Sequence, residues 1–272
     1  MYQCLVQANS LPTDDELLRS TDSTSQDIVK QPDMQSALTT QGHLLLAEDN
    51  PVNQAVALGM LRKFGYTVDV VKNGLEAIDA VQHKTYDLVL MDCMMPEMDG
   101  YRATTEIRRQ QSAGRLHHFP IIALTANAIE GDREKCLTTG MDDYLAKPIK
   151  AKDLVNIIEL WLGNSKSIRS RNNLSELEQS NNQDSIDPDA LASIRSLEVD
   201  YGDELLKQVI STYLDNSSKL MQALEQAWSI GDLKAIRMTS HTLKSSSSQV
   251  GAHSLAELFR NVENEARNDI YD

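Results

Sequence analysis

The stretch Tyr86-Asp-Leu-Val-Leu-Met-Asp-Cys-Met-Met-Pro-Glu-Met-Asp-Gly100 decides the fold of this chain. An apolar run ends on a single acid, Asp92, and residues typical of turns follow at once. A short apolar run of this kind predicts a fully buried strand, as in a parallel sheet. Because parallel α/β sheets bind ligands at the carboxyl ends of their strands, Asp92 is expected where a reaction takes place.

A second apolar run, residues 43–47, ends in the same way on Glu48 and Asp49. Asn50 and Pro51 follow, a capping residue and a proline that suits the first turn of a helix. Further apolar runs alternate with amphipathic patterns, and this alternation predicts an α/β doubly wound domain with a five-stranded parallel sheet. The strands are expected near residues 43–48, 67–71, 86–91, 120–125 and 143–146.

Length and charge limit the function classes. The chain has 272 residues, enough for about two domains, and a formal net charge of -14. This acidic excess argues against nucleic acid as a partner, because binding it requires a basic face. The cysteines Cys4, Cys93 and Cys136 form no C-x-x-C pair, which favours a reducing compartment over a disulfide framework or a zinc site.

No stretch of the sequence has the length and apolar character of a membrane span, and the first residues do not read as a signal peptide. We therefore expect a cytoplasmic chain without direct membrane contact, in which any membrane anchor belongs to another part of its parent protein.

Composition also divides the chain. Residues 9–42 are rich in Ser, Thr, Asp and Gln, which predicts that residues 1–42 are mostly a disordered linker, with residues 1–8 as the tail of a preceding domain. The α/β domain is expected over residues 43–163 and a flexible linker over residues 164–186. Residues 187–272 read as helical throughout.

In this last segment, apolar or small residues recur every three or four positions and predict three long helices, the first ending at Gly231 and the second capped by Asp232. Three such helices favour an antiparallel bundle that lacks its last helix. The predicted seam positions are Leu206, Ile210, Tyr213, Leu220, Leu224 and Ala227, then Leu233, Ile236, Ser240, Leu243, Ser247 and Val250, and finally Leu255, Leu258, Phe259, Val262 and Ala266.

The predicted sheet brings three acids, a hydroxyl and an amine to one edge. They are Glu48, Asp49, Asp92, Thr125 and Lys147. Two carboxylates about 4 Å apart repel by roughly 4 kcal/mol at an effective dielectric near 20, so the cluster needs a counterion. Mg²⁺ suits Asp49, Asp92, Glu48 through water, and a loop carbonyl such as that of Met94.

Asp92 would keep one carboxylate oxygen free beside such an ion. A carboxylate is a competent nucleophile toward phosphorus, and Mg²⁺, Lys147 and Thr125 would hold the phosphoryl oxygens. The expected product is an acyl phosphate. Two other acid or base positions are interpreted as structural: Asp99 as a helix cap, and His117-His118 as a solvated loop rather than a metal site.

Residues 43–163 resemble the receiver domain of bacterial two-component signalling, the CheY-like fold. The resemblance rests on Ala47-Glu48-Asp49-Asn50, Met91-Asp92, Met94-Met95-Pro96-Glu97-Met98-Asp99-Gly100, Leu124-Thr125-Ala126 and Tyr144-Leu145-Ala146-Lys147-Pro148. It implies that Asp92 is phosphorylated and that Lys147-Pro148 is a cis peptide. It also implies that Tyr144 turns inward when Thr125 engages the phosphoryl group.

The helix after Asp232 carries a second candidate nucleophile. Opposite its seam lie Arg237, His241, Lys244, Ser245 and Ser248, which predicts that His241 is exposed. An imidazole titrates near neutral pH and can attack phosphorus, and the flanking cations Arg237 and Lys244 would attract a phosphoryl group.

The stretch Ser240-His241-Thr-Leu-Lys244-Ser-Ser-Ser-Ser-Gln-Val-Gly251-Ala252 resembles the histidine phosphotransfer (HPt) domain. Members of that family commonly have Gly four residues after the His, where this chain has Ser245. The resemblance implies a four-helix bundle, and since only three bundle helices and a short lead-in follow residue 187, we expect a sequence truncated at its C-terminus.

These features predict the C-terminal part of a bacterial hybrid sensor histidine kinase working in a phosphorelay. Asp92 would accept phosphate from the histidine of an upstream kinase domain, and His241 would pass it to a downstream response regulator receiver. The chain has no glycine-rich nucleotide-binding box, so it is not expected to phosphorylate itself from ATP.

Three alternatives stay open. A non-catalytic module, switched by phosphate on Asp92 with His241 idle, would keep signalling after His241 is substituted. A metal-dependent phosphohydrolase is disfavoured because Cys93-Met94 follows Asp92, with no acid two residues on to protonate a leaving group. A DNA-binding regulator is disfavoured because no basic recognition helix follows the α/β domain.

Overall fold

A computed structural model describes residues 41–126, 130–163, 186–197 and 203–267. All of these belong to one compact unit, residues 38–272. The linkers predicted over residues 1–42 and 164–186 therefore lie almost wholly outside the described residues.

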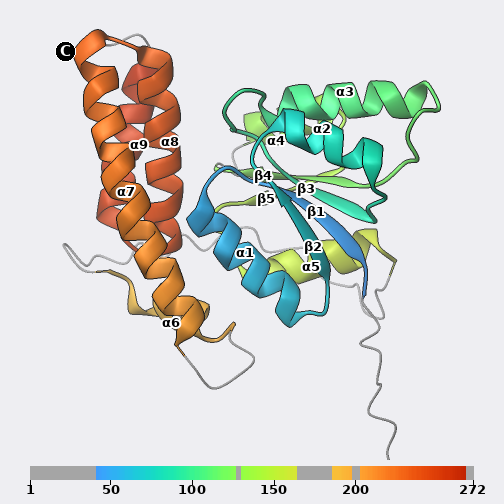
Figure 1. Ribbon diagram of the computed structural model, residues 1–272, viewed down its shortest axis with the longest axis horizontal. Helices are drawn as coiled ribbons and strands as arrows, with labels where there is room; N and C mark the ends of the chain where they lie inside the picture. Colours follow the sequence, from blue (N-terminus) through green and yellow to red (C-terminus); the bar gives the residue numbers. More distant parts are fainter. Residues whose placement is uncertain (1–40, 127–129, 164–185, 198–202, 268–272) are drawn as a thin grey trace, which may run out of the picture. The chain divides into compact units, whose positions relative to one another are not determined.

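The described chain begins with a five-stranded parallel sheet, as the sequence predicts. Its strands are β1 (His43–Ala47), β2 (Thr67–Val71), β3 (Leu88–Asp92), β4 (Ile121–Thr125) and β5 (Asp143–Ala146). Their spatial order is β2-β1-β3-β4-β5, and every neighbouring pair is parallel (Figure 1). The carboxyl ends of β1 and β3 are therefore adjacent, so the acids that follow them meet.

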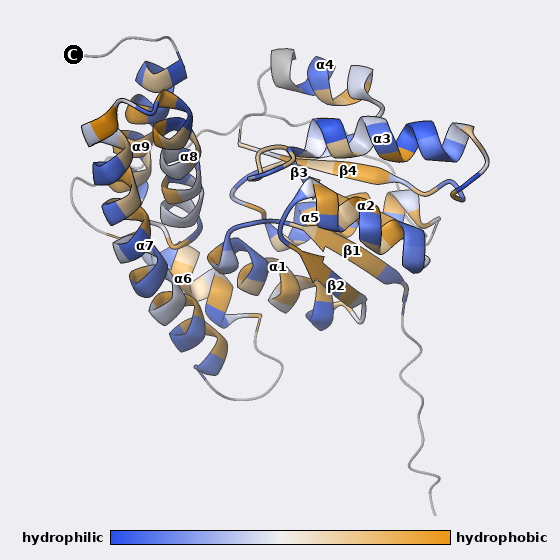
Figure 2. Ribbon diagram, turned by 45° about the horizontal axis from the view of Figure 1, so that its top comes forward, coloured by the Kyte–Doolittle hydropathy of each residue, from blue (hydrophilic) through white to orange (hydrophobic). Residues whose placement is uncertain are grey.

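Helices cover both faces of this sheet because every buried strand side chain needs an apolar partner. Consecutive strand residues, such as Leu44 and Leu45, belong to opposite faces. The first face packs against α1 (Pro51–Lys63) and α5 (Ala151–Trp161). The second packs against α2 (Gly74–His83), α3 (Gly100–Ser112) and α4 (Glu130–Thr139). Figure 2 shows the apolar strands between these helical layers.

The predicted helix caps are confirmed. The amide of Val52 donates to Asn50 Oδ1 at 3.0 Å, which starts α1, and the amide of Arg102 donates to Asp99 Oδ1 at 2.8 Å, which starts α3. The peptide bond before Pro148 is cis, as the resemblance implied. The two capping bonds hold the turns that follow β1 and β3.

The helical segment consists of α6 (Pro188–Arg195), α7 (Glu204–Ile230), α8 (Leu233–Gln249) and α9 (His253–Arg267). As predicted, α7 ends at Gly231, which has a φ of 69°, and Asp232 caps α8 through the amide of Ala235. The three long helices share a core made by Leu224, Ala227, Ile236, Leu243, Phe259 and Ala266.

Three seam predictions are wrong, because Ile210, Leu255 and Leu258 are exposed in the described part of the chain. Periodicity identifies the apolar stripe of a helix but not the width of the surface that neighbouring helices cover. The apolar layer on α1 also continues beyond the sheet domain, through Ile194 of α6 and Leu206 and Val209 of α7.

Within the described residues, no helix is long and apolar enough to cross a membrane.

Gly100 is expected to be intolerant of any side chain. A Cβ at this position would lie 2.1 Å from the carbonyl oxygen of Asp92 and 2.8 Å from Met91 Cγ. Gly100→Ala should therefore displace the end of β3 and lower the free energy of unfolding by several kcal/mol, in the upper range for point variants. Urea unfolding measures this change.

Gly114→Ala, just beyond the other end of α3, serves as the control. No atom of the described residues lies within 4 Å of a Cβ there, although φ is 70°, so only about 1–2 kcal/mol of backbone strain is expected. Equal losses for the two variants would contradict the overlap at Asp92.

Candidate functional site

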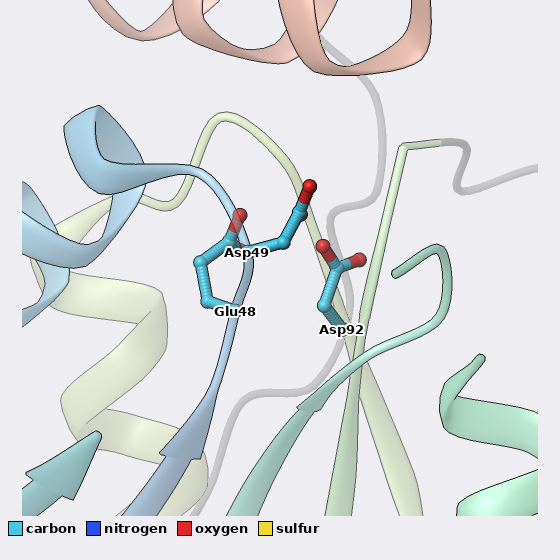
Figure 3. Close-up of side chains that lie close together, drawn as sticks. All are labelled: Glu48, Asp49 and Asp92. Atoms are coloured by element: carbon cyan, nitrogen blue, oxygen red, sulfur yellow. The ribbon is translucent and has the colours of Figure 1, made fainter. Parts of the chain in front are cut away.

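Three carboxylates gather where β1 and β3 end (Figure 3). Glu48 and Asp49 follow β1, and Asp92 is the last residue of β3. Each offers a ligand oxygen, and these oxygens all lie within 4.8 Å of one another. Glu48 and Asp92 are almost fully buried, with exposed fractions of 1% and 2%. The structure thus brings together the three acids that the sequence assigned to one edge.

Lys147 enters this cluster from the end of β5. Its Nζ lies 2.6 Å from Glu48 Oε2 and 2.7 Å from Asp92 Oδ2, and the lysine side chain is only 5% exposed. Its amide donates to the carbonyl oxygen of Thr125 at 2.7 Å. The predicted amine and hydroxyl residues therefore share the edge with the acids.

The two oxygens of Asp92 have different surroundings. Oδ2 faces Lys147, whereas Oδ1 accepts a hydrogen bond of 3.2 Å from the amide of Met94. Met94 thus lies in the turn directly after Asp92. The coordination of an ion by its carbonyl oxygen stays a prediction.

Charge is not balanced within this cluster. The pKa of Asp92 is raised well above its usual range, chiefly by burial and secondly by the charge of Glu48. Lys147 opposes this shift. Burial and Glu48 likewise raise the pKa of Asp49 to about 6. Burial alone would lower the pKa of Lys147, yet Asp92 and Glu48 raise it above its ordinary value. One ammonium is thus insufficient for three acids, and a hard divalent ion such as Mg²⁺ fits this set of oxygen donors.

The prediction that His241 is exposed is wrong. The side chain lies in the middle of α8 and the residue is only 4% exposed, and Lys244 and Ser245 beside it are 7% and 6% exposed. The stripe opposite the apolar seam faces Glu263 of α9 on one side. On the other, the amide of Asn53 in α1 donates to Ser245. The polar residues of this stripe therefore form buried contacts with α9 and α1, and they do not form a solvated face.

Glu263 fixes the state of the His241 ring. His241 Nδ1 lies 2.9 Å from Glu263 Oε1, and Lys244 Nζ lies 2.5 Å from Glu263 Oε2. A carboxylate only accepts hydrogen bonds, so Nδ1 must carry the proton and donate it. Nε2 has no hydrogen-bond partner among the residues that the structure describes. The free lone pair of a neutral ring therefore lies on Nε2.

Burial lowers the pKa of His241 below its ordinary value, although the hydrogen bond from Nδ1 to Glu263 works in the opposite direction. Burial would raise the pKa of Glu263, but His241 and Lys244 together lower it to about 2. At neutral pH the pair is thus an ionised carboxylate and a neutral imidazole, which is the nucleophilic form.

Sequence reasoning missed Glu263, although a signal was present. The residue lies four positions after Phe259 and three before Ala266, on the apolar stripe of its own helix. A glutamate on a buried stripe requires a cationic or hydrogen-bonding partner. Lys244, predicted to attract a phosphoryl group, supplies that partner and is held by it.

Two other residues discussed in the sequence analysis, Tyr144 and His117, lie outside both clusters and each contacts a neighbouring residue. The guanidinium carbon of Arg133 lies 5.9 Å from the centroid of the Tyr144 ring, and the inward turn of Tyr144 stays a prediction. His117 Nε2 lies 3.3 Å from the carbonyl oxygen of Tyr86, and the ring packs edge-on against Phe119.

Comparison with known families identifies both parts of the chain. Residues 44–159 match the response regulator receiver domain, and residues 208–270 match the Hpt domain. The sheet with its acidic edge and the helices around His241 thus define a receiver domain followed by an Hpt domain.

Relatives of this chain are hybrid histidine kinases. Over 120 residues it is 46% identical to hybrid signal transduction histidine kinase B of Dictyostelium discoideum, a match that covers 41% of this chain and 6% of the relative. It is 41% identical over 120 residues to the sensor protein GacS of Pseudomonas syringae, covering 44% of this chain and 13% of the relative. The matched stretch is thus a small part of these proteins, and their sources are not only bacterial.

Solved structures are similar in the same region. The receiver domain of a sensor histidine kinase from Pseudomonas aeruginosa, crystallised with magnesium in its active-site cleft, is 52% identical, with 45% of this chain and 98% of that one covered and a TM-score of 0.41. A chain in the co-crystal of a yeast histidine phosphotransfer protein with the receiver of its downstream regulator is 32% identical, with 44% and 87% covered and a TM-score of 0.41.

Mg²⁺ is expected to stabilise the fold by binding the acid cluster. At 100 times its dissociation constant, an ion that binds only the folded state contributes about 2.7 kcal/mol. Asp49→Asn should lose this increment but be at least as stable as the wild type in EDTA, because one repelling charge is removed. Thermal unfolding in MgCl₂ and in EDTA measures both effects.

Asp153→Asn, an exposed acid in the first turn of α5, is the matched control and should keep the full Mg²⁺ increment. An unchanged increment in Asp49→Asn would place the ion elsewhere.

His241 is expected to make stability depend on pH. Its folded pKa lies below the ordinary value of 6.5, so the unfolded chain takes up a proton first as the pH falls. The free energy of unfolding should therefore decrease as the pH falls from 7.5 through 6.5 toward the lowered folded pKa. Urea unfolding of the wild type and of His241→Gln at several pH values isolates this contribution.

In His241→Gln this dependence should be weaker, whereas His253→Gln, an exposed histidine on α9, should retain it. If His241→Gln has the same pH profile as the wild type, the ring is not held neutral by the fold.

Proposed function

We propose that this chain is the phosphotransfer part of a hybrid histidine kinase and works as two steps of a phosphorelay. The observation that carries the proposal is the state of His241: Nδ1 is bonded to Glu263, while Nε2 has no hydrogen-bond partner in the described chain. The next residue, Thr242, lies beside the acid cluster, with its Oγ1 3.5 Å from Asp49 Oδ2. A nucleophilic nitrogen is thus carried on a helix that contacts the receiver edge.

In the first step, an oxygen of Asp92 attacks the phosphoryl group of a phosphohistidine in an upstream kinase domain. The P–O bond forms as the donor's P–N bond breaks, and the product is an acyl phosphate. Lys147 neutralises charge on the acceptor, and Thr125 lies at the same strand-end edge. Glu48, Asp49 and Asp92, with the carbonyl of Met94, would hold Mg²⁺, which screens the phosphoryl oxygens when bound.

In the second step, the lone pair of His241 Nε2 attacks the phosphorus and the P–O bond to Asp92 breaks. The carboxylate of Asp92 is regenerated, and the phosphorylated ring acquires positive charge. Glu263 faces the Nδ1 proton of that ring at 2.9 Å and stabilises the charge. A downstream response regulator receiver then takes the phosphoryl group by the reverse chemistry.

The alternative, an idle HPt segment beside a phosphate-controlled receiver, is not favoured. An unused histidine would have no reason to be buried, neutral and oriented by a buried carboxylate, since burial of polar groups is costly without compensation.

The test is to load the chain with radiolabelled acetyl phosphate and Mg²⁺ and to separate the two products by stability. Acyl phosphate is lost in alkali, whereas phosphohistidine survives alkali and is lost in acid. The wild type should give both products, His241→Gln only acyl phosphate, and Asp92→Asn neither. Labelling of Asp92 alone in the wild type would overturn the relay.

Two variants with the same chemical changes at exposed sites serve as controls. His253→Gln and Asp153→Asn should both behave like the wild type. The alternative function predicts instead that His241→Gln has no effect on any readout.

A further inference from the structure

The turn of α8 that carries His241 contacts the receiver through polar groups. Asn50 Nδ2 donates to the carbonyl oxygen of Thr242 at 3.0 Å, and Asn53 Nδ2 donates to Ser245 Oγ at 2.8 Å. Both donors belong to the start of α1, directly after the acids Glu48 and Asp49. The contact therefore joins the two halves of the candidate site within one chain.

Asn53 is oriented by the acid cluster itself. One N–H of its amide donates to Glu48 Oε1 at 2.9 Å, and Nδ2 also donates to Ser245 Oγ. Rotating the amide by half a turn would place its carbonyl oxygen against the carboxylate, so the assignment of nitrogen and oxygen is fixed by Glu48. Asn53 is 4% exposed, and its Oδ1 has no partner in the described chain. The two contacts of Nδ2 thus hold this side chain.

Ser245 is the position at which HPt domains commonly have Gly. Glycine offers no side-chain acceptor, and the second N–H of Asn53 would then be buried without a partner, which costs about 1–3 kcal/mol. The hydroxyl of Ser245 satisfies this donor while the residue stays 6% exposed. Ser245, which replaces the common Gly, thus has a hydrogen-bond partner, Asn53, in the receiver of the same chain.

The hydrogen bond between Asn53 and Ser245 also affects where His241 lies relative to the receiver. Ser245 lies four residues after His241, so both point from the same face of α8, one helical turn apart. Fixing Ser245 against Asn53 fixes the rotation and height of that face above the strand ends. A second contact lies further along α1. There α1 packs closely against α7, and a Cβ on Gly59 would be 2.8 Å from Leu205 Cδ2.

We propose that Asn53 and Ser245 are positioning residues for transfer from Asp92 to His241, and that this pair matches the HPt segment to the receiver of the same chain. The proposal rests on the proposed function and adds to it the route of transfer, which is within one chain. Neither residue is assigned a part in bond making.

The experiment measures the rate of alkali-stable labelling of His241 from labelled Asp92, by rapid quench in the full chain. Ser245→Ala and Ser245→Gly should slow this transfer about fivefold, the effect of losing one neutral hydrogen bond. Ser245→Thr, which keeps the hydroxyl, should restore it. In a His241→Gln background, where label cannot pass to the histidine, the extent of Asp92 labelling by acetyl phosphate should be the same in all three variants, because Ser245 does not belong to the receiver.

A double-mutant comparison separates positioning from general disruption. Asn53→Ala should slow transfer, and adding Ser245→Ala to it should cause no further loss, because both remove the same contact. Ser246→Ala is the control: among the residues that the structure describes, its hydroxyl bonds only to carbonyl oxygens within α8, and transfer should stay at the wild-type rate.

The route is tested by dilution and mixing. In the wild type the rate constant should not change with protein concentration, and a mixture of Asp92→Asn and His241→Gln chains should transfer more slowly and in proportion to concentration. A wild-type rate in Ser245→Ala, additive losses in the double variant, or fast transfer in the mixture would each overturn the inference. If His241 is never labelled, the proposed function itself fails.

Discussion

The ion pairs of Lys147 with Glu48 and Asp92 are the constraint on which the candidate site depends. Two carboxylates buried side by side are unfavourable, and an ammonium within 2.7 Å of both makes the arrangement possible. The parallel topology imposes this meeting, because β1 and β3 are neighbours and β5 ends at the same edge. The fold thereby keeps Asp92 buried and ionisable, with one cation present and oxygen ligands left for a second.

The two proposed nucleophiles, Asp92 and His241, have surroundings of opposite charge. Asp92 lies among other acids, and burial and Glu48 raise its pKa, so the cation Lys147 is needed to favour the ionised form. The pKa of His241 is lowered by burial, and the carboxylate of Glu263 would stabilise the positive charge that the ring acquires in the proposed transfer. In each case a buried partner of opposite charge offsets the unfavourable burial. In the proposed transfer of a phosphoryl group, a charge on Asp92 or on His241 would therefore always have a partner of opposite charge beside it.

Much of this could be predicted from sequence because it depends on short-range rules. Asn50, Asp99 and Asp232 were identified as caps from one residue type at one position, and each makes the expected bond. The strand-end acids followed from the topology alone. The failures concern contacts between elements distant in sequence. The sequence predicts a solvated stripe around His241 because its partners are distant in sequence. Glu263, which contacts His241, lies 22 residues after it, and Asn53, which contacts Ser245, lies 192 residues before it.

The proton on His241 Nδ1 has a further consequence for the direction of phosphate flow. In the proposed relay this proton stays with the ring and Glu263 throughout, so the attacking nitrogen needs no base and the departing carboxylate needs no acid. By microscopic reversibility, the return step passes through the same contacts. In the proposed relay the direction of transfer is then set by the relative free energies and amounts of the phosphorylated donor and the empty acceptor, and not by the supply of a proton at His241.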